Sequence, residues 1–351
     1  MISFYPGPSR TYSLIPDYVQ DAAKTGVMSM NHRSSECMAL VKKTIQELRK
    51  KLSIPASYTV LFTSSATECW EIIAQSLIND QSIHLYNGAF GSKWFNYTKA
   101  IKPNALSDSF AVNHALNPNQ LSYDQGDTIC ITQNETSNGT QVSNAIIRGI
   151  KKNNPNHLIA VDATSSLGGI ELNFASADVW FASVQKCLGL PAGLAVLICS
   201  SRAITRAEQV GNTTHYNSLI NQVRMIKKFQ TTHTPNVLGI YLLYRVMKSV
   251  SAISVIHKRI SKQANEYISM INRIPYLEMY ANNTDVLSDT VMTVKASEEA
   301  IKKIKWRAKK AGLLLGEGYG ALKLTTFRIA NFPAIHQKEI KALRSFMEEL
   351  T

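Results

Sequence analysis

Four short polar segments of this chain each follow an apolar run, and they carry residue types that do chemistry. The segments are 64–67, 133–136, 162–166 and 184–186. If the apolar runs are parallel strands, their carboxyl ends meet along one edge of a sheet, where open α/β sheets bind ligands. Segment 64–67 also begins a helical pattern. The free N–H groups and positive dipole end of a helix N-terminus suit a phosphate.

Asp162 and Lys186 add two further chemical functions to this edge. A lysine forms a Schiff base with an aldehyde. An aspartate opposite a pyridine nitrogen keeps that nitrogen protonated and makes the ring an electron sink. Each feature has a plainer explanation, since Asp162 could cap a turn, 64–67 could be an ordinary N-cap and Lys186 could be a surface lysine. Their order at successive strand ends favours a site for pyridoxal 5′-phosphate, which needs all three.

The apolar runs predict the elements that position these residues. Strands are expected at 58–63, 128–132, 158–162, 179–183 and 194–199. These runs lack polar alternation, which is typical of strands covered on both faces. Residues 68–77 have helical spacing after the first strand. The alternation predicts an α/β fold in which helices flank a mostly parallel, mixed sheet.

The texture of the sequence changes near residue 240. Residues 238–274 are apolar-periodic and predict one or two helices leading into a smaller α+β domain, with strands at 290–296 and 322–330. We therefore predict an N-terminal arm at 1–15, a large cofactor-binding domain at 16–240 and a small C-terminal domain at 241–351. Such boundaries are loose by several residues.

Several motifs resemble those of class V aminotransferases, which have the fold type I architecture of pyridoxal-phosphate enzymes. "VDATSSLGG" and "ADVWFASVQKCLGLPAGLAVLICS" resemble the cofactor-anchoring region. "NHRSSE", "NETSNG", "THTP" and "FRIANF" follow in matching order, and the opening "FYPGPS" resembles the arm of phosphoserine aminotransferases. The resemblance spans nearly the whole chain. It implies a homodimer with an active site shared across the interface.

The resemblance also implies a role for individual residues. Lys186 would carry the cofactor as a Schiff base, Asp162 would pair with the pyridine nitrogen, and Phe90 would stack on the ring. The remaining cofactor contacts would come from Thr136 and Thr164 near the ring hydroxyl and Asp162, from Ala66, Thr67 and Gln185 at the phosphate, and from Thr234 of a second subunit. Arg328 would grip the substrate α-carboxylate. His32 and Arg33 would face the distal anionic group from across the interface.

The substrate is predicted less narrowly than the reaction. The leading expectation is transamination between phosphoserine and 2-oxoglutarate. Near the position of the small-domain His-Arg pair of phosphoserine aminotransferases this chain has Ala321 and Leu322, and "GYG-x-LK" resembles the serine/alanine–glyoxylate branch. Transamination of serine or alanine with glyoxylate or pyruvate is the alternative. A non-catalytic cofactor-binding protein and a basic nucleic-acid-associated protein are weaker alternatives.

The composition of the chain limits the classes of partner that we expect it to bind. The formal net charge is +13, which suits anionic ligands. The densest basic stretch, 302–312, predicts a solvated helix whose Ile301, Ile304, Trp306 and Leu313 face inward. No nucleic-acid-binding motif accompanies it, so no nucleic-acid partner is expected.

Five cysteines without a C-x-x-C pattern argue against disulfides and against a metal site. No apolar run approaches ~18 residues, so we expect no membrane partner and a cytoplasmic location.

Overall fold

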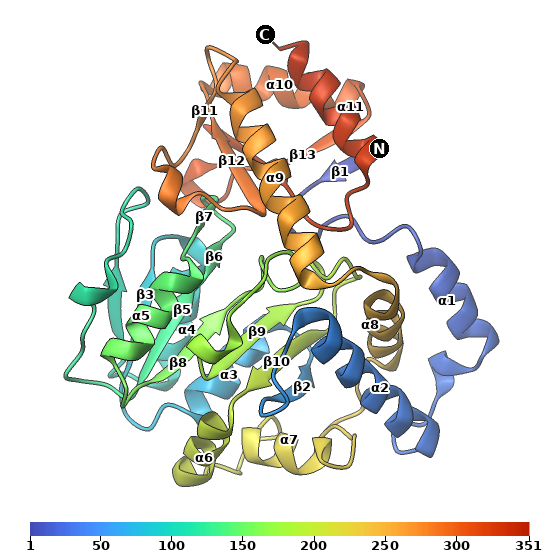
Figure 1. Ribbon diagram of the computed structural model, residues 1–351, viewed down its shortest axis with the longest axis vertical. Coiled ribbons are helices and arrows are strands. Elements are labelled where there is room, and N and C mark those ends of the chain that lie inside the picture. The colour runs from blue at the N-terminus through green and yellow to red at the C-terminus, as the bar shows by residue number, and fades with distance from the viewer. Residues whose placement is uncertain (351) are drawn as a thin grey trace.

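The computed structural model describes residues 1–350 and contains two main β-sheets joined by a long helix, α9 (Figure 1). The larger sheet has seven strands in the order β2-β10-β9-β8-β5-β3-β4. Their bounds are β2 Thr59–Thr63, β3 Ser82–Tyr86, β4 Leu106–Ser109, β5 Thr128–Thr132, β8 Leu158–Asp162, β9 Val179–Ser183 and β10 Ala195–Cys199. Only β10 runs antiparallel to its neighbours, so the sheet is mostly parallel, as predicted.

Burial explains why the central strands read as unbroken apolar runs. Strands β5, β8, β9 and β10 are buried along their whole length, because helices cover the sheet. Helix α3 contacts β9 and helix α4 contacts β5, while α6 contacts β10 and α7 contacts β2. Their bounds are α3 Ala66–Ser76, α4 Ala89–Ile101, α6 Ser201–Val210 and α7 Leu219–Ile226, with α5 at Asn144–Asn153. This arrangement is the flanked α/β sheet that the sequence predicts.

The second sheet has five strands in the order β1-β13-β14-β12-β11. Their bounds are β1 Ile2–Phe4, β11 Glu278–Met279, β12 Val291–Lys295, β13 Leu313–Glu317 and β14 Thr326–Ala330. Strand β1, from the predicted N-terminal arm, pairs in parallel with β13. Helices α10 (Glu298–Lys310) and α11 (Gln337–Glu348) complete this part of the molecule, which lies at the top of Figure 1. A small two-stranded sheet joins β6 (Asn134–Glu135) to β7 (Thr140–Gln141).

Two hydrophobic cores correspond to the two sheets, and α9 (Ile253–Ile271) contributes to both. Ile253, Ile256 and Ile260 belong to the core around the seven-stranded sheet, whereas Tyr267 and Ile271 belong to the other core. Helices α1 (Ile15–Lys24), α2 (Ser35–Leu52) and α8 (Val237–Ser249) pack together beside the larger core. Helix α8 spans residue 240, where the sequence places the domain boundary. The boundaries themselves stay predictions.

The prediction that Trp306 faces inward from the basic helix is wrong. Ile301 and Ile304 of α10 are buried, but the side chain of Trp306 is 58% exposed. Its ring instead lies 3.9 Å from Lys310 Nζ. Trp306 and Lys310 are one helical turn apart, so the lysine covers an exposed ring and gains a cation–π contact.

Within residues 1–350, no single helix is both long and apolar enough to cross a membrane. Helices α8 and α9 reach the required hydropathy only as a pair, and they meet at an 83° bend.

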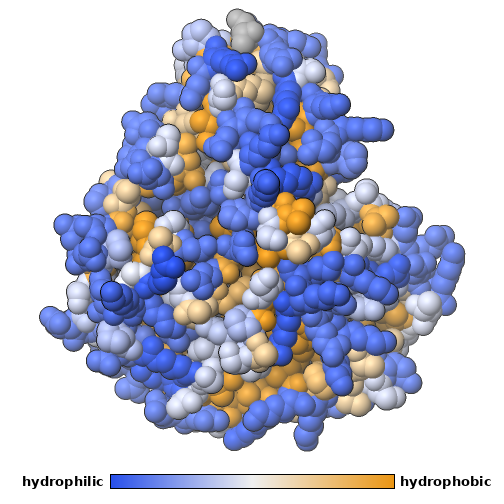
Figure 2. All heavy atoms as spheres, viewed as in Figure 1, coloured by the Kyte–Doolittle hydropathy of each residue, from blue (hydrophilic) through white to orange (hydrophobic). Residues whose placement is uncertain are grey.

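Most of the face shown in Figure 2 is hydrophilic, with an apolar area between α2 and α7. A groove there is lined by Ile45, Val60, Ile226 and Phe229, with Lys42 and Arg49 among the residues at its sides.

Candidate active site

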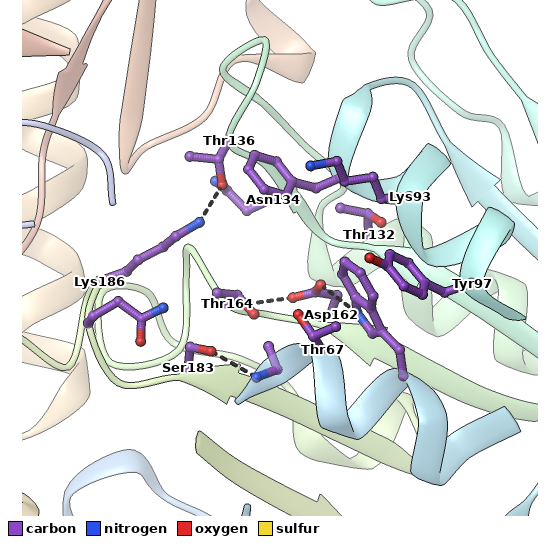
Figure 3. Close-up of a pocket in the computed structure, with 14 residues that line it drawn as sticks. Thr67, Lys93, Tyr97, Thr132, Asn134, Thr136, Asp162, Thr164, Ser183 and Lys186 are labelled. Carbon is purple, nitrogen blue, oxygen red and sulfur yellow. Dashed lines mark hydrogen bonds between the residues drawn. The ribbon is translucent and has the colours of Figure 1, made fainter. Parts of the chain in front are cut away.

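A cavity of about 210 Å³ lies at the carboxyl ends of β5, β8 and β9, next to the first turns of α3 and α4 (Figure 3). Its lining residues are Ala66, Thr67, Trp70, Phe90, Lys93, Tyr97, Thr132, Asn134, Thr136, Asp162, Thr164, Ser183, Gln185 and Lys186. The set includes eight residues predicted from the sequence to contact the cofactor. The topology thus brings together polar segments that are up to 120 residues apart in the chain, as expected for the ligand-binding edge of an α/β sheet.

Lys186 follows β9 and extends its side chain into this cavity (Figure 3). Its Nζ donates to Thr136 Oγ1 at 2.9 Å and to Ser165 Oγ at 3.0 Å. The same ammonium lies 5.0 Å from the centre of the Phe90 ring. Burial disfavours the charged form and lowers the pKa of Lys186 to about 8, although Asp162 opposes this shift. A buried amine with a lowered pKa is suited to nucleophilic attack on an aldehyde.

Asp162 ends β8, and backbone and side-chain donors fix its carboxylate. Thr164 N donates to Oδ1 at 2.9 Å, and the indole N–H of Trp70 donates to Oδ2 at 3.3 Å. Burial raises the pKa of Asp162, and these hydrogen bonds partly offset the shift. A cationic N–H donor placed opposite this buried carboxylate would stabilise its charged form.

The first turn of α3 offers backbone donors to the cavity. Ser65 caps the helix by accepting a hydrogen bond from Glu68 N. Ala66 N donates to Ser183 Oγ at 2.9 Å (Figure 3), and both Thr67 and Gln185 line the cavity nearby. The Glu68 carboxylate turns back to accept from Ser64 N and Ser64 Oγ at 2.7 Å. The first turn of α3 therefore combines a capped start with two residues, Ala66 and Thr67, that line the cavity.

Phe90 lies in the first turn of α4, which the Glu135 carboxylate holds in place. Glu135 accepts hydrogen bonds from the backbone N–H groups of Phe90 and Gly91 at 3.1 Å. It also accepts from Ser137 N and Ser137 Oγ. An added Cβ at Gly88 would lie 2.4 Å from Glu135 Cγ, so this glycine permits the close approach. The result is an aromatic ring at a fixed position on the cavity wall.

Arg328 lies on β14 of the smaller sheet, and its guanidinium reaches the loop that carries Thr136. Its Nε donates to Glu317 O at 2.7 Å and its Nη1 to Thr136 O at 2.8 Å. The side chain is buried, and burial lowers its pKa. Arg328 is not among the residues lining the cavity, but its contact with Thr136 places it beside them.

Three residues predicted from the sequence lie away from the cavity of their own chain. Arg33 and Thr234 are exposed and His32 is half-buried. Arg33 Nη1 donates to Gln230 Oε1 at 2.6 Å. Their predicted role in the site of a second subunit stays a prediction.

Seven residues that contact the cavity or Lys186 have no individual role predicted from the sequence: Trp70, Lys93, Tyr97, Thr132, Asn134, Ser165 and Ser183. Asn134 and Ser165 lie within the predicted strand-end segments, and Thr132 and Ser183 each end a strand beside one. Trp70 and Lys93 project from the bodies of α3 and α4. Their direction depends on how each helix lies on the sheet, which sequence spacing alone does not give.

Comparison with known proteins places this architecture in a family. The model of the family described as aminotransferase class-V matches residues 98–318, which include Asp162 and Lys186. This chain belongs to the class V aminotransferases. Members of this family use pyridoxal 5′-phosphate, and their substrates are amino acids and 2-oxo acids.

Individual relatives cover nearly the whole of this aminotransferase. A phosphoserine aminotransferase of Nocardioides sp. is 27% identical over 97% of this chain and 92% of its own length. The crystal structure of a phosphoserine aminotransferase from Cytophaga hutchinsonii is 29% identical, has a TM-score of 0.94 and covers 99% of this chain and 98% of its own. The alanine–glyoxylate aminotransferase of Nostoc sp., at 17% identity, 99% and 94% coverage and a TM-score of 0.83, shares the fold. The fold type I architecture predicted from the sequence is confirmed.

Proposed function

We propose that this aminotransferase binds pyridoxal 5′-phosphate in the cavity around Lys186 and transfers the amino group of phosphoserine to 2-oxoglutarate. The observation that carries the substrate assignment is the likeness to the Cytophaga phosphoserine aminotransferase along the full length of both chains. A cytoplasmic, biosynthetic role is the prediction that accompanies this reaction.

The donors and acceptors of the cavity fit this cofactor. Among the described residues, Asn134 Nδ2 and Thr164 Oγ1 are buried without a hydrogen-bond partner, and both residues line the cavity. Buried polar atoms are normally paired, so these two atoms suit the polar substituents of a bound ring. Asp162 would pair with the ring nitrogen, Phe90 would cover a ring face, and Ala66, Thr67 and Gln185 would hold the phosphate, joined by Thr234 of a second subunit. Thr136 would bind the ring hydroxyl.

When bound, pyridoxal 5′-phosphate supplies an aldehyde that condenses with amines and a ring that accepts the electrons released at Cα. Lys186 Nζ would hold this aldehyde. Its amine, once free, would take the proton from substrate Cα as a base and return it to the C4′ carbon of the cofactor as an acid. Asp162 would face the ring nitrogen, and Trp70 and Thr164 N hold its two carboxylate oxygens in place.

Arg328 would fix the α-carboxylate of the substrate. A guanidinium presents a planar set of donors that matches a carboxylate, whereas an ammonium is a point charge. Two of its N–H groups already anchor it to Glu317 O and Thr136 O, so the remaining donors are held in a fixed direction. We propose that His32 and Arg33 of a second subunit face the distal group, in a homodimer that shares its sites.

The alternative function is transamination of serine or alanine with glyoxylate or pyruvate. It is favoured by Ala321 and Leu322, which lie near the position at which phosphoserine aminotransferases have a His-Arg pair, and by the preceding "GYG". The two functions differ in the distal anionic group, which phosphoserine and 2-oxoglutarate carry and which serine, alanine, glyoxylate and pyruvate lack. Half-reaction rates of the same preparation with phosphoserine, serine, alanine and glutamate therefore separate them.

The test of the proposal begins with the cofactor. Wild-type protein incubated with pyridoxal 5′-phosphate should turn yellow, and borohydride should fix the cofactor to Lys186 as a mass increase on that peptide. K186A should show neither, and its turnover should fall by about 10²–10⁴-fold. K248A, which removes an exposed lysine of α8, is the matched control and should behave as wild type. A colourless wild type would overturn the proposal. A rate with phosphoserine no higher than the rate with alanine would favour the alternative function instead.

A further inference from the structure

Lys93 is a cation of the cavity that the assignments above leave without a role. It projects from α4 one helical turn after Phe90 and is exposed, yet it lines the cavity (Figure 3). Its Nζ lies 5.9 Å from the centre of the Phe90 ring, and Lys186 Nζ lies 5.0 Å from the same centre. The two ammonium groups therefore flank one aromatic ring, one deep in the cavity and the other at its exposed side.

The polar partner of Lys93 is the hydroxyl of Tyr319, at 2.7 Å from Nζ. Tyr319 follows β13 in the smaller sheet, so this contact joins the parts of the chain that carry the two sheets. Within residues 1–350, Lys93 forms no ion pair, and no carboxylate contributes to the rise in its pKa, whose first cause is the Tyr319 hydrogen bond. Lys93 is thus a cation without an anion, directed at a hydroxyl that can itself donate.

Tyr319 also connects Lys93 to Arg328. The Arg328 guanidinium carbon lies 5.6 Å from the centre of the Tyr319 ring, and Lys93 Nζ lies 5.4 Å from it. The Tyr319 ring in turn lies 4.9 Å from the Phe90 ring. Lys93 and Arg328 therefore both lie beside the Tyr319 ring, and Lys186 lies beside the Phe90 ring that contacts it. Two cations near one ring are what a substrate with two anionic groups requires.

We infer that Lys93 and Tyr319 bind the distal anionic group of the substrate while Arg328 binds its α-carboxylate. The inference deepens the proposed function and rests on it. In phosphoserine the phosphorus, and in glutamate the distal carboxyl carbon, is separated from the α-carboxyl carbon by the same number of bonds. One pair of donors can therefore serve both halves of the reaction. The ammonium of Lys93 supplies charge, and the Tyr319 hydroxyl, now its acceptor, turns to donate to the same anion.

This pair also accounts for the departure noted in the sequence. Tyr319 stands two residues before Ala321, close to the position at which phosphoserine aminotransferases carry a His-Arg pair. In this chain the ammonium of Lys93 from α4 and the hydroxyl of Tyr319 from the loop after β13 would take the place of that His-Arg pair. The chemical class of substrate is accordingly an amino acid with a second anionic group, and specificity depends on both parts of the chain.

The test compares substrates that differ only at the distal group. Phosphoserine and serine form one matched pair, and glutamate and alanine form another that differs in the presence of a distal carboxylate. Single-turnover kcat/KM is measured for all four with wild type, K93M, K93R, Y319F and the control K99M, which removes an exposed lysine further along α4. The phosphoserine-to-serine ratio should fall by about tenfold to a hundredfold in K93M. It should fall less in Y319F, return largely to the wild-type value in K93R, and be unchanged in K99M.

A second readout does not depend on turnover. Glutarate carries two carboxylates and no amine, and its binding to the holoenzyme can be measured by calorimetry. Its dissociation constant should rise about tenfold or more in K93M and be unchanged in K99M. Equal losses with serine and phosphoserine, or unaltered ratios together with unaltered glutarate binding, would overturn the inference.

The result also separates this inference from the proposed function. If wild type shows no preference for phosphoserine over serine, the substrate proposal fails while the glutamate-to-alanine ratio still tests Lys93. If wild type reacts with none of the four amino acids, the transamination proposal fails and glutarate binding still decides the role of Lys93. The melting temperature of each variant confirms that the fold is retained.

Discussion

The indole N–H of Trp70 lies 3.3 Å from Asp162 Oδ2 and donates a hydrogen bond to this buried carboxylate, which lines the same cavity as Lys186. Trp70 belongs to α3, whose first turn also supplies the donors proposed to hold the cofactor phosphate. In the proposed complex a single helix would act at both ends of the ring: its N-terminus would bind the phosphate, and its second turn fixes the acid that would face the ring nitrogen.

We predict that W70F weakens cofactor binding. Phenylalanine keeps the aromatic packing but removes a donor to a buried, charged acceptor, which costs about 1.5–3 kcal/mol. The pKa of Asp162, already raised by burial, should rise further, and the dissociation constant for pyridoxal 5′-phosphate should increase by about tenfold or more. An absorbance titration of the apoenzyme measures this constant. W306F, which alters an exposed tryptophan far from the cavity, should leave it unchanged. Equal affinity in wild type and W70F would contradict the assignment.

The lowered pKa of Lys186 gives a pH dependence with a definite sign. Only the neutral amine attacks an aldehyde, so the rate of Schiff-base formation by the apoenzyme should rise with pH while Lys186 is mostly protonated. The rise should level off near pH 8, because burial lowers the pKa to about 8. A lysine with an ordinary pKa, about 10.4, would continue to gain reactivity above pH 9. Stopped-flow absorbance after mixing apoenzyme with cofactor measures the profile, and a rate still rising steeply at pH 9.5 would show that Lys186 is not desolvated.

Arg328 should affect every amino acid equally, in contrast to Lys93. R328K keeps the positive charge but loses the planar donor pair and the anchoring contacts to Glu317 O and Thr136 O. We expect kcat/KM to fall by about tenfold to a hundredfold for phosphoserine, serine and alanine alike. The ratio between substrates should change little, because the α-carboxylate is common to all of them. A loss confined to phosphoserine would instead assign Arg328 to the distal group.

An element or site residue of this chain is predictable from the sequence when its signal is local, and it is not when distant parts of the chain set its position. Strands β5, β8 and β9 have the predicted bounds, because a strand buried on both faces carries its own signal. Strand β3 was missed: its His84 lies buried against Trp94, so a polar residue interrupts the apolar run. Strand β1 was missed because its partner, β13, is more than 300 residues away. Lys93 and Trp70 were missed because their directions are set by the packing of α3 and α4 on the sheet.

A final prediction concerns the residues that lie outside the cavity of their own chain. If Arg33 completes the site of a second subunit, R33A and K186A should each be inactive toward phosphoserine as pure dimers. Mixed under conditions that exchange subunits, they should form hybrids in which one site combines Lys186 of the R33A chain with Arg33 of the K186A chain. Such a symmetric, two-site dimer should recover about a quarter of wild-type activity at equal mixing, since half of the dimers are hybrids with one intact site.

The matched control for this experiment is a mixture of K186A with K93M. Lys93 and Lys186 line the same cavity of one chain, so the site of a hybrid that has Lys186 lacks Lys93 and gains nothing from the partner. Activity in this mixture should be no more than the K93M subunits supply alone. Sedimentation should first show that the wild type is a dimer. Recovery in the control and not in the R33A mixture would reverse the assignment, placing Arg33 in the site of its own chain and Lys93 in that of its neighbour.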